Sequence, residues 1–234
     1  TITGQTYTLL SAEDLLARLQ KATAPIRLRA TAIVGRLYAP TAGLDTVRAA
    51  LHFEEVLFLE EVTLNNVVFL GPVYAERTVF ASGLSLLGAH FQDSFVLRAS
   101  HSGKHLNLKR ATFAGAVDLS DDNFAEPSSF IEAHFARQAR FARTRFGAAA
   151  YFESARFDGH AEFRDAYFSG VASFKDAVWG DNAVFAGVRF DQRALFWRAR
   201  FLAQADFTAV RADGEFSCNG AIFADRADFA DFTF

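Results

Sequence analysis

An eleven-residue period runs through this chain from Phe53 to Phe234, and it constrains the fold more than any other feature. Two interleaved series, one counted from residue 53 and one from residue 58, together contain 24 of the 27 phenylalanines. Five of the ten remaining series positions are leucine, and Trp179 occupies another. A period this strict predicts a coil that returns to the same place in each turn, because repeat proteins grow by stacking rather than by enlarging one core.

The steps of this period alternate between five and six residues, as in the stretch from Phe152 to Phe168. Neither a helix, with a period of 3.6, nor a free strand, with a period of 2, produces this spacing. Alanine is frequent two residues before a series position, which predicts short strands with large and small side chains pointing inward. A two-sided coil would bring its sheets too close to hold stacked rings, so we predict a four-sided tube with 22 residues per turn.

Stacked aromatic rings should therefore line the interior of the tube. Each buried ring contributes roughly 2–3 kcal/mol by area, and contact between rings adds about 0.5–1.5 kcal/mol. The predicted structural core of the most regular part comprises Phe141, Phe146, Phe152, Phe157, Phe163, Phe168, Phe174, Trp179, Phe185, Phe190, Phe196 and Phe201.

The A-x-F-x-x steps resemble the pentapeptide-repeat family, whose usual unit is A-(D/N)-L-x-x. The alternating spacing with phenylalanine is similar to the Phe-rich branch of that family, and the resemblance covers residues 53–234. It implies an all-β fold, a right-handed quadrilateral parallel β-helix, which agrees with the general right-handed preference of parallel crossovers. The chain departs from the family pattern before the central residue, where arginine often replaces Asp or Asn: Arg140, Arg145, Arg156, Arg189, Arg200 and Arg211.

Residues 1–52 lack the period and are predicted to form a leader before the repeat domain at 53–234. The segment from Ser11 to Asp14 has the form of a capping box, and three leucines follow on one face, so we expect an amphipathic helix over about 12–22. Residues 26–34 alternate like a strand, and 35–52 are expected to form an irregular first turn. The helix is expected to cover the open end of the tube, with a partner-binding helix as the alternative.

The leader is also expected to fold over apolar residues that point outward in the first two turns. These residues are Leu57, Leu59, Val68, Leu70 and Val79. The chain contains no Met and its period stops in mid-step at Phe234, so we expect either a fragment or a protein with one open end.

Composition narrows the possible partners. The net charge of −3 favours neither nucleic acid nor an anionic membrane, so direct nucleic-acid binding is not expected. The single cysteine, Cys218, falls on a series position and is predicted to be a buried, reduced thiol, which is typical of a cytoplasmic protein. No stretch is long and apolar enough to span a bilayer, so membrane attachment is expected only through segments outside this chain.

The sequence contains no recognisable catalytic, cofactor or metal motif, so we do not expect an enzyme. His90 and His134 fall on one outward column but two turns apart, too far to share an ion. Residues 101–105 contain Gly-Lys without the glycine spacing of a P-loop; we predict a solvated bulge there, with a ligand nook as the alternative. Residues 121–123 resemble half of a calcium loop and are predicted to be a corner.

Exposed aromatic residues are the remaining functional signal. Trp197 should point outward beside Leu195 and next to Arg198, with Tyr151 on the same face, and a tryptophan flanked by arginine is typical of an interface anchor. We therefore predict a non-enzymatic structural or interaction module, which could be the soluble part of a larger protein. Its expected partner is another protein or a further domain of the same chain.

The alternative function is implied by the resemblance, since some relatives mimic DNA and protect a type II topoisomerase, gyrase. Such mimicry needs a long acidic face. The face that contains residue 53 carries ten acidic residues against five arginines, and the arginines interrupt the middle of that face.

Overall fold

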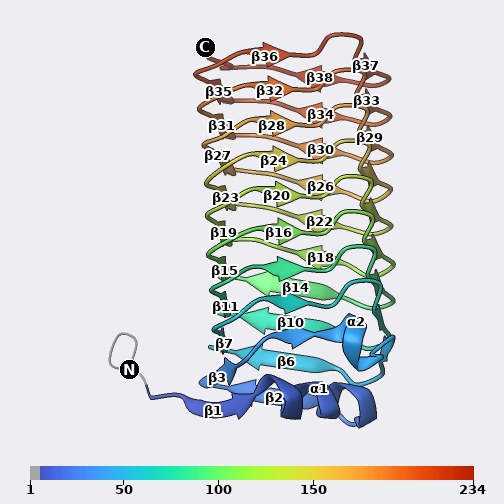
Figure 1. Cartoon of the computed structure of the whole chain (residues 1–234). Coiled ribbons are helices and arrows are strands. Elements are labelled where there is room, and N and C mark those ends of the chain that lie inside the picture. Colours follow the sequence, from blue (N-terminus) through green and yellow to red (C-terminus); the bar gives the residue numbers. More distant parts are fainter. Residues whose placement is uncertain (1–5) are drawn as a thin grey trace.

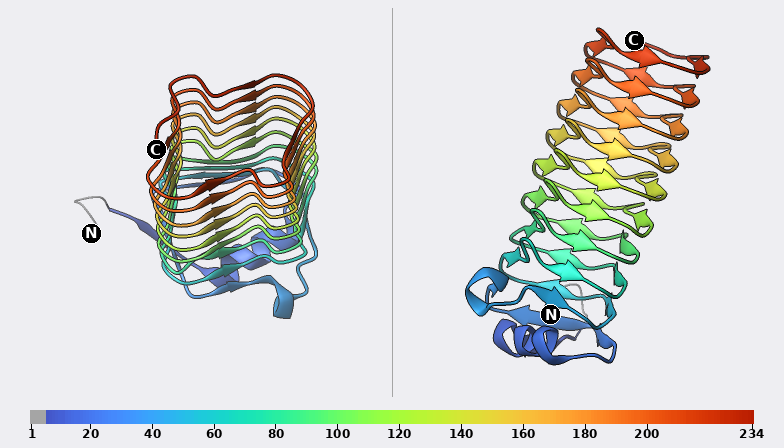
Figure 2. Two further views of the ribbon diagram at one scale, coloured as in Figure 1. Left: turned by 90° about the horizontal axis from the view of Figure 1, so that it is seen from above. Right: turned by 90° about the vertical axis from the view of Figure 1, so that its right-hand side faces the viewer.

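The computed structural model describes residues 6–234, which form a four-sided tube of parallel strands (Figure 1). The chain winds in a right-handed sense, as Figures 1 and 2 show. It makes about 10 turns of about 22 residues each. The prediction of a quadrilateral parallel β-helix is confirmed. We number the four sheets as walls 1 to 4, in the order in which the chain meets them in each turn of the repeat.

Walls 1 and 2 each contain ten strands. The strands of wall 1 are β2 (Ile26–Arg29), β6 (Leu51–Glu54), β10 (Val73–Glu76), β14 (Phe95–Arg98), β18 (Val117–Asp118), β22 (Ala139–Arg140), β26 (Ala161–Glu162), β30 (Ala183–Val184), β34 (Ala205–Asp206) and β38 (Ala227–Asp228). Those of wall 2 are β1 (Thr8–Ser11), β3 (Thr31–Val34), β7 (Leu57–Phe58), β11 (Val79–Phe80), β15 (His101–Ser102), β19 (Asn123–Phe124), β23 (Arg145–Phe146), β27 (Tyr167–Phe168), β31 (Arg189–Phe190) and β35 (Arg211–Ala212).

Walls 3 and 4 each contain nine strands. Wall 3 consists of β4 (Leu37–Tyr38), β8 (Val62–Thr63), β12 (Leu84–Ser85), β16 (Leu106–Asn107), β20 (Ser128–Ser129), β24 (Ala150–Tyr151), β28 (Ala172–Ser173), β32 (Ala194–Leu195) and β36 (Phe216–Ser217). Wall 4 consists of β5 (Thr46–Val47), β9 (Val68–Phe69), β13 (His90–Phe91), β17 (Thr112–Phe113), β21 (His134–Phe135), β25 (Arg156–Phe157), β29 (Val178–Trp179), β33 (Arg200–Phe201) and β37 (Ile222–Phe223). The helices are α1 (Ala12–Lys21) and α2 (Ala39–Ala42).

The alternation of five- and six-residue steps follows from two kinds of corner. The five-residue steps join wall 1 to wall 2 and wall 3 to wall 4, and most of them contain a residue in the left-handed region two positions after the buried ring, such as Arg143 (φ 57°) or Arg198 (φ 53°). A left-handed residue turns the chain more tightly than an extended one, although it costs a non-glycine residue about 1–2 kcal/mol. The tube therefore uses a regular set of slightly strained corners.

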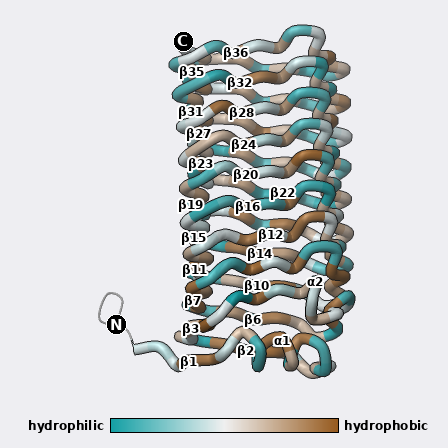
Figure 3. Tube along the Cα trace, viewed as in Figure 1, coloured by the Kyte–Doolittle hydropathy of each residue, from teal (hydrophilic) through white to brown (hydrophobic). Residues whose placement is uncertain are grey.

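The core consists of ring ladders that run along the tube axis. In wall 1, Phe141, Phe163 and Phe185 stack with centroid distances of 4.7 and 4.8 Å and nearly parallel planes. Rings from opposite walls meet edge to face across the interior, as Phe152 of wall 3 and Phe163 of wall 1 do at 5.4 Å. All twelve residues of the predicted core are at most 1% exposed. Burial is thus spread evenly over the levels, and Figure 3 shows hydrophobic and hydrophilic segments alternating around the turns.

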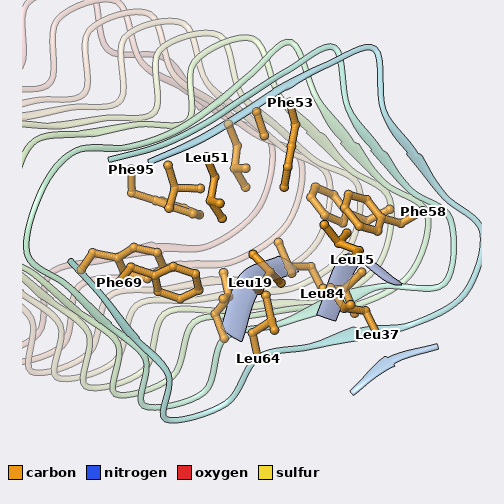
Figure 4. A pocket seen from close by; sticks show the side chains of 17 residues that line it. Leu15, Leu19, Leu37, Leu51, Phe53, Phe58, Leu64, Phe69, Leu84 and Phe95 are labelled. Atoms are coloured by element: carbon orange, nitrogen blue, oxygen red, sulfur yellow. The ribbon is translucent and has the colours of Figure 1, made fainter. Parts of the chain in front are cut away.

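Helix α1 lies across the N-terminal end of the tube (Figure 2). Ser11 caps it, because its hydroxyl accepts a hydrogen bond from the Asp14 backbone N–H at 3.0 Å. Leu15 and Leu19 are buried and point into the end of the tube, where they border an apolar cavity of about 40 Å³ (Figure 4). The cavity also borders Ala75, the one small residue in a column that has Phe53 on one side and Leu97 on the other.

The leader differs from its predicted form in two respects. Residues 26–34 are not one strand: Ala30 adopts a left-handed conformation (φ 43°) and makes a corner between β2 in wall 1 and β3 in wall 2. Residues 35–52 then supply β4 and β5, so the leader contributes a complete turn of the coil with α2 inserted at one corner. An alternating pattern of apolar residues fits both a long strand and two short ones that meet at such a corner.

The leader covers the end of the tube rather than its side. Of the residues expected to be covered, Leu57 is buried beside the leader strand β3, but Leu59 remains 40% exposed and Leu70 39% exposed, so the leader does not fold over these two. At the opposite end, Cys218 is only partly buried rather than enclosed, since it lies in the last turn. Burial raises the pKa of its thiol to about 11, so the thiolate form is disfavoured at neutral pH.

Candidate functional site

Trp197 lies at the corner between walls 3 and 4 and is 36% exposed. Its indole Nε1–H donates a hydrogen bond to the Ser217 Oγ at 2.8 Å, which holds the ring against wall 3. The polar group of the side chain is therefore satisfied within the protein, and the remaining exposed surface is apolar. A rigid, partly exposed indole of this kind is the side chain most often found at the centre of protein interfaces.

Leu195 and Tyr151 belong to one outward column of wall 3. Leu195 is paired with Ser173 and Ser217, and Tyr151 with Ser129 and Ser173, so one serine separates the two larger side chains along the column. Both are half-buried. The structure thus places Leu195 two residues from Trp197 and Tyr151 two levels below it, on the same wall.

Arg198, the fourth predicted residue, is engaged by Asp176 one level below. Its Nε and Nη2 donate to the two carboxylate oxygens at 2.7 and 2.6 Å. The hydrogen bonds from Arg198 hold the pKa of the Asp176 carboxyl below its ordinary value. Arg198 therefore offers a partner less free charge than the sequence pattern indicated.

This pairing belongs to a rule that the sequence already contained. Residues 22 positions apart in the sequence lie side by side in neighbouring levels. Where two such residues carry opposite charges at the left-handed corners, their side chains form hydrogen-bonded ion pairs. The pairs are Arg110 with Glu132, Asp121 with Arg143, and Asp176 with Arg198. Reading the charged residues at an offset of 22 would have predicted that Arg198 is neutralised.

The predicted polar breaks have structural roles. Ser102 is buried in the column of rings, and its hydroxyl donates to the carbonyl oxygen of Lys104 at 3.0 Å, so its side chain is not part of a solvated bulge. Asp122 is also buried: its Oδ1 accepts the Ser100 N–H at 2.7 Å while its Oδ2 has no partner within residues 6–234. Burial raises the pKa of Asp122 well above its ordinary value.

The histidines of wall 4 bond to neighbouring side chains instead of to each other. The Nδ1 of His90 lies 2.6 Å from the Oγ1 of Thr112, and the Nε2 of His134 lies 2.7 Å from Asp158. No cluster of three or more potential metal ligands occurs among residues 6–234. Over the same range, no helix is long and apolar enough to cross a membrane.

The acidic face predicted for wall 1 is largely paired with arginine. Arg77 bonds Glu54 and Glu55, Arg98 bonds Asp118, and Arg140 and Arg164 both lie 3.8 Å from Glu162. Near the leader this wall carries a shallow groove of about 590 Å³, bordered by Arg27, Arg29, His52, Glu54, Tyr74 and Glu76. Its charges are mixed, which does not single out one class of ligand.

Comparisons with known proteins bear on the repeat alone. Residues 108–156 and 152–200 match a family model described as pentapeptide repeats (9 copies). No curated protein and no solved structure matches the chain.

Proposed function

We propose, from the match of residues 108–200 to the pentapeptide-repeat model, that the chain is a non-enzymatic interaction module that binds another protein, or a further domain of the same chain, through its outer walls. The main support for this proposal is the exposed apolar surface of Trp197, which lies beside Leu195 on a rigid wall. The side chains of this wall are held in place by the ladder of strands, so binding orders few groups. Preorganised aromatic anchors of this kind lose little conformational entropy on association.

The tube itself supports a binding role more than a catalytic one. Its interior is filled by rings, and its outer surface presents short strands and corners whose charged residues are largely paired. Catalytic sites need a concave pocket with titratable groups that converge on a substrate. The partly buried Cys218 has a raised pKa and lacks the activation that a nucleophile needs.

Mimicry of DNA, the alternative function, receives less support from the geometry. Seven of the ten acidic residues on the face that contains wall 1 lie in ion pairs with arginine. The negative electrostatic potential of this face is therefore weaker than its number of acidic residues indicates. A mimic of the phosphate backbone needs regularly spaced, unpaired negative charges. A gyrase supercoiling assay in the presence of a quinolone would test this alternative directly.

The proposed interaction is tested by comparing wild-type protein with Trp197→Ala as baits for quantitative affinity capture. The matched control is Leu59→Ala, which removes a similarly exposed apolar side chain at the corner between walls 2 and 3. We expect at least one protein to be retained by wild type and by the control but lost with Trp197→Ala. Identical captured proteins for all three baits would contradict the proposed role of this surface.

A further inference from the structure

A second surface lies on wall 4 near its C-terminal end, and it is unusually apolar for an outer wall. Arg200 is flanked in the neighbouring strands by Val178 and Ile222. Leu202, two residues after Arg200, is 43% exposed and Ile222 is 53% exposed. We name Val178, Arg200, Leu202 and Ile222 the wall 4 patch; neighbouring levels lie about 4.8 Å apart, so it is continuous.

Arg200 differs from the other arginines that occupy outward strand positions on walls 2 and 4. Arg156, Arg189 and Arg211 are each followed two residues later by an aspartate, and each donates its Nε–H to that aspartate at 2.6 or 2.7 Å. Arg145 has glycine at that place, and its guanidinium stacks on the Tyr167 ring at 5.6 Å. The repeat thus neutralises or covers its strand arginines as a rule.

Arg200 has Leu202 where the others have aspartate, and its side chain forms no ion pair, hydrogen bond or ring contact within residues 6–234. Nearby carboxylates are engaged elsewhere: Asp176 by Arg198, Asp181 by the backbone N–H of Asn182, and Asp225 by that of Arg226. Arg200 is therefore an exposed arginine with aliphatic residues beside it in both neighbouring strands.

We propose that the wall 4 patch binds a protein segment that presents one carboxylate flanked by large apolar side chains. An arginine with no internal partner can form a bidentate bond with an incoming carboxylate, and the aliphatic residues around it would exclude water from that bond. A nucleic acid is a poorer fit, because phosphate binding relies on several cations along a path rather than on one among aliphatic groups. This inference rests on the proposed interaction function and names the chemistry of one partner.

The probe is a phage-displayed library of random 12-residue peptides, selected on the purified wild-type protein. We expect the enriched peptides to share an Asp or Glu with large apolar neighbours. The affinity of a synthetic copy is then measured by fluorescence polarisation. Arg200→Gln and Leu202→Ser are each expected to weaken binding about tenfold or more. Arg189→Gln, which makes the same change at an arginine of wall 2 outside the wall 4 patch, should leave the affinity within about twofold.

Exchanging the charges of peptide and protein distinguishes a specific bond between Arg200 and a carboxylate from non-specific hydrophobic binding. Replacing the peptide acid by Lys should abolish binding to wild type and restore it to Arg200→Glu. Enriched peptides without an acid, or peptides that bind Arg200→Gln as well as wild type, would overturn the inference, as would retention on anionic phosphatidylserine vesicles with no peptide enriched. If the enriched peptides bind Arg200→Gln as well as wild type but lose affinity for Trp197→Ala, the inference fails while the proposed interaction function stands.

Discussion

Replacement of Phe163 by alanine tests whether the ring ladders hold the tube together. Phe163 is fully buried, stacks on Phe141 and Phe185, and meets Phe152, Phe157 and Phe174 edge to face at 5.4–6.0 Å. Truncation of a buried phenylalanine costs about 3–5 kcal/mol, and the cost rises when the cavity cannot collapse. The backbone around residue 163 is fixed by hydrogen bonds of 2.7 Å to neighbouring levels, so we expect about 4–5 kcal/mol.

The same replacement in the last turn should cost much less. Phe229 belongs to the same column, is 41% exposed, and stacks on one side only, against Phe207 at 5.0 Å. Solvent would fill the space left by the ring, so no cavity forms. The only cost is the lost free energy of burying the ring away from water. With roughly three-fifths of the side chain buried, we expect Phe229→Ala to cost about 1–2 kcal/mol.

Equilibrium unfolding in guanidinium chloride, followed by circular dichroism, measures both costs. Phe163→Leu is the matched control, because Leu119 occupies the same column two levels away and leucine keeps most of the buried volume. It should lose less than half as much stability as Phe163→Ala. Equal costs for Phe163→Ala and Phe229→Ala would refute the reasoning, since the stabilisation would then not depend on enclosure between two levels.

Three further changes test other parts of the structure. Asp122→Ser copies Ser100 of the same column and should stabilise the protein by about 1–3 kcal/mol at pH 7, because burial raises the pKa of the wild-type carboxyl and so penalises its charged form in the folded state, whereas the unfolded chain ionises freely. This gain should shrink as the pH falls through about 4 and below, where the unfolded chain also becomes protonated, and unfolding at several pH values would show whether it does. Ala75→Leu should fill the cavity under α1 and raise stability by about 1 kcal/mol, visible as a higher Tm; a lower Tm would mean that the site is already filled. Leu15→Asp should uncover the apolar end of the tube and raise the molar mass measured by light scattering through self-association, and a molar mass equal to that of wild type would argue that α1 is not needed as a cover.

The architecture could be predicted from the sequence because one physical constraint repeats in every turn. Each series position from Phe130 to Phe207 must return to the interior, and only a four-sided coil with the observed spacing allows this. Ala30 shows where that reasoning stops: a single left-handed residue divides an alternating segment into two walls, and alanine carries no sequence signal for it. Corners that rely on glycine or asparagine are easier to predict.

The candidate site was less predictable than the fold. Trp197 and Leu195 were placed outward from the alternation alone, which holds wherever the strands are regular. The hydrogen bonds of Arg198 and Asp122 are formed with residues one turn away, and these partners are not visible when only adjacent residues in the sequence are inspected. Charge at the surface of a solenoid is therefore better judged in columns than along the chain.

The uniform turn also makes residue number a measure of position. Within residues 53–234, division by 22 yields a height along the tube and a remainder that specifies the wall. Insertion of 22 residues would lengthen the tube by one strand spacing, about 4.8 Å, and leave every wall in place. Insertion of 11 would carry everything that follows to the opposite wall. Evolution can therefore adjust the separation between two binding patches, or turn them to face different directions, by copying whole or half turns without altering the packing within any of them.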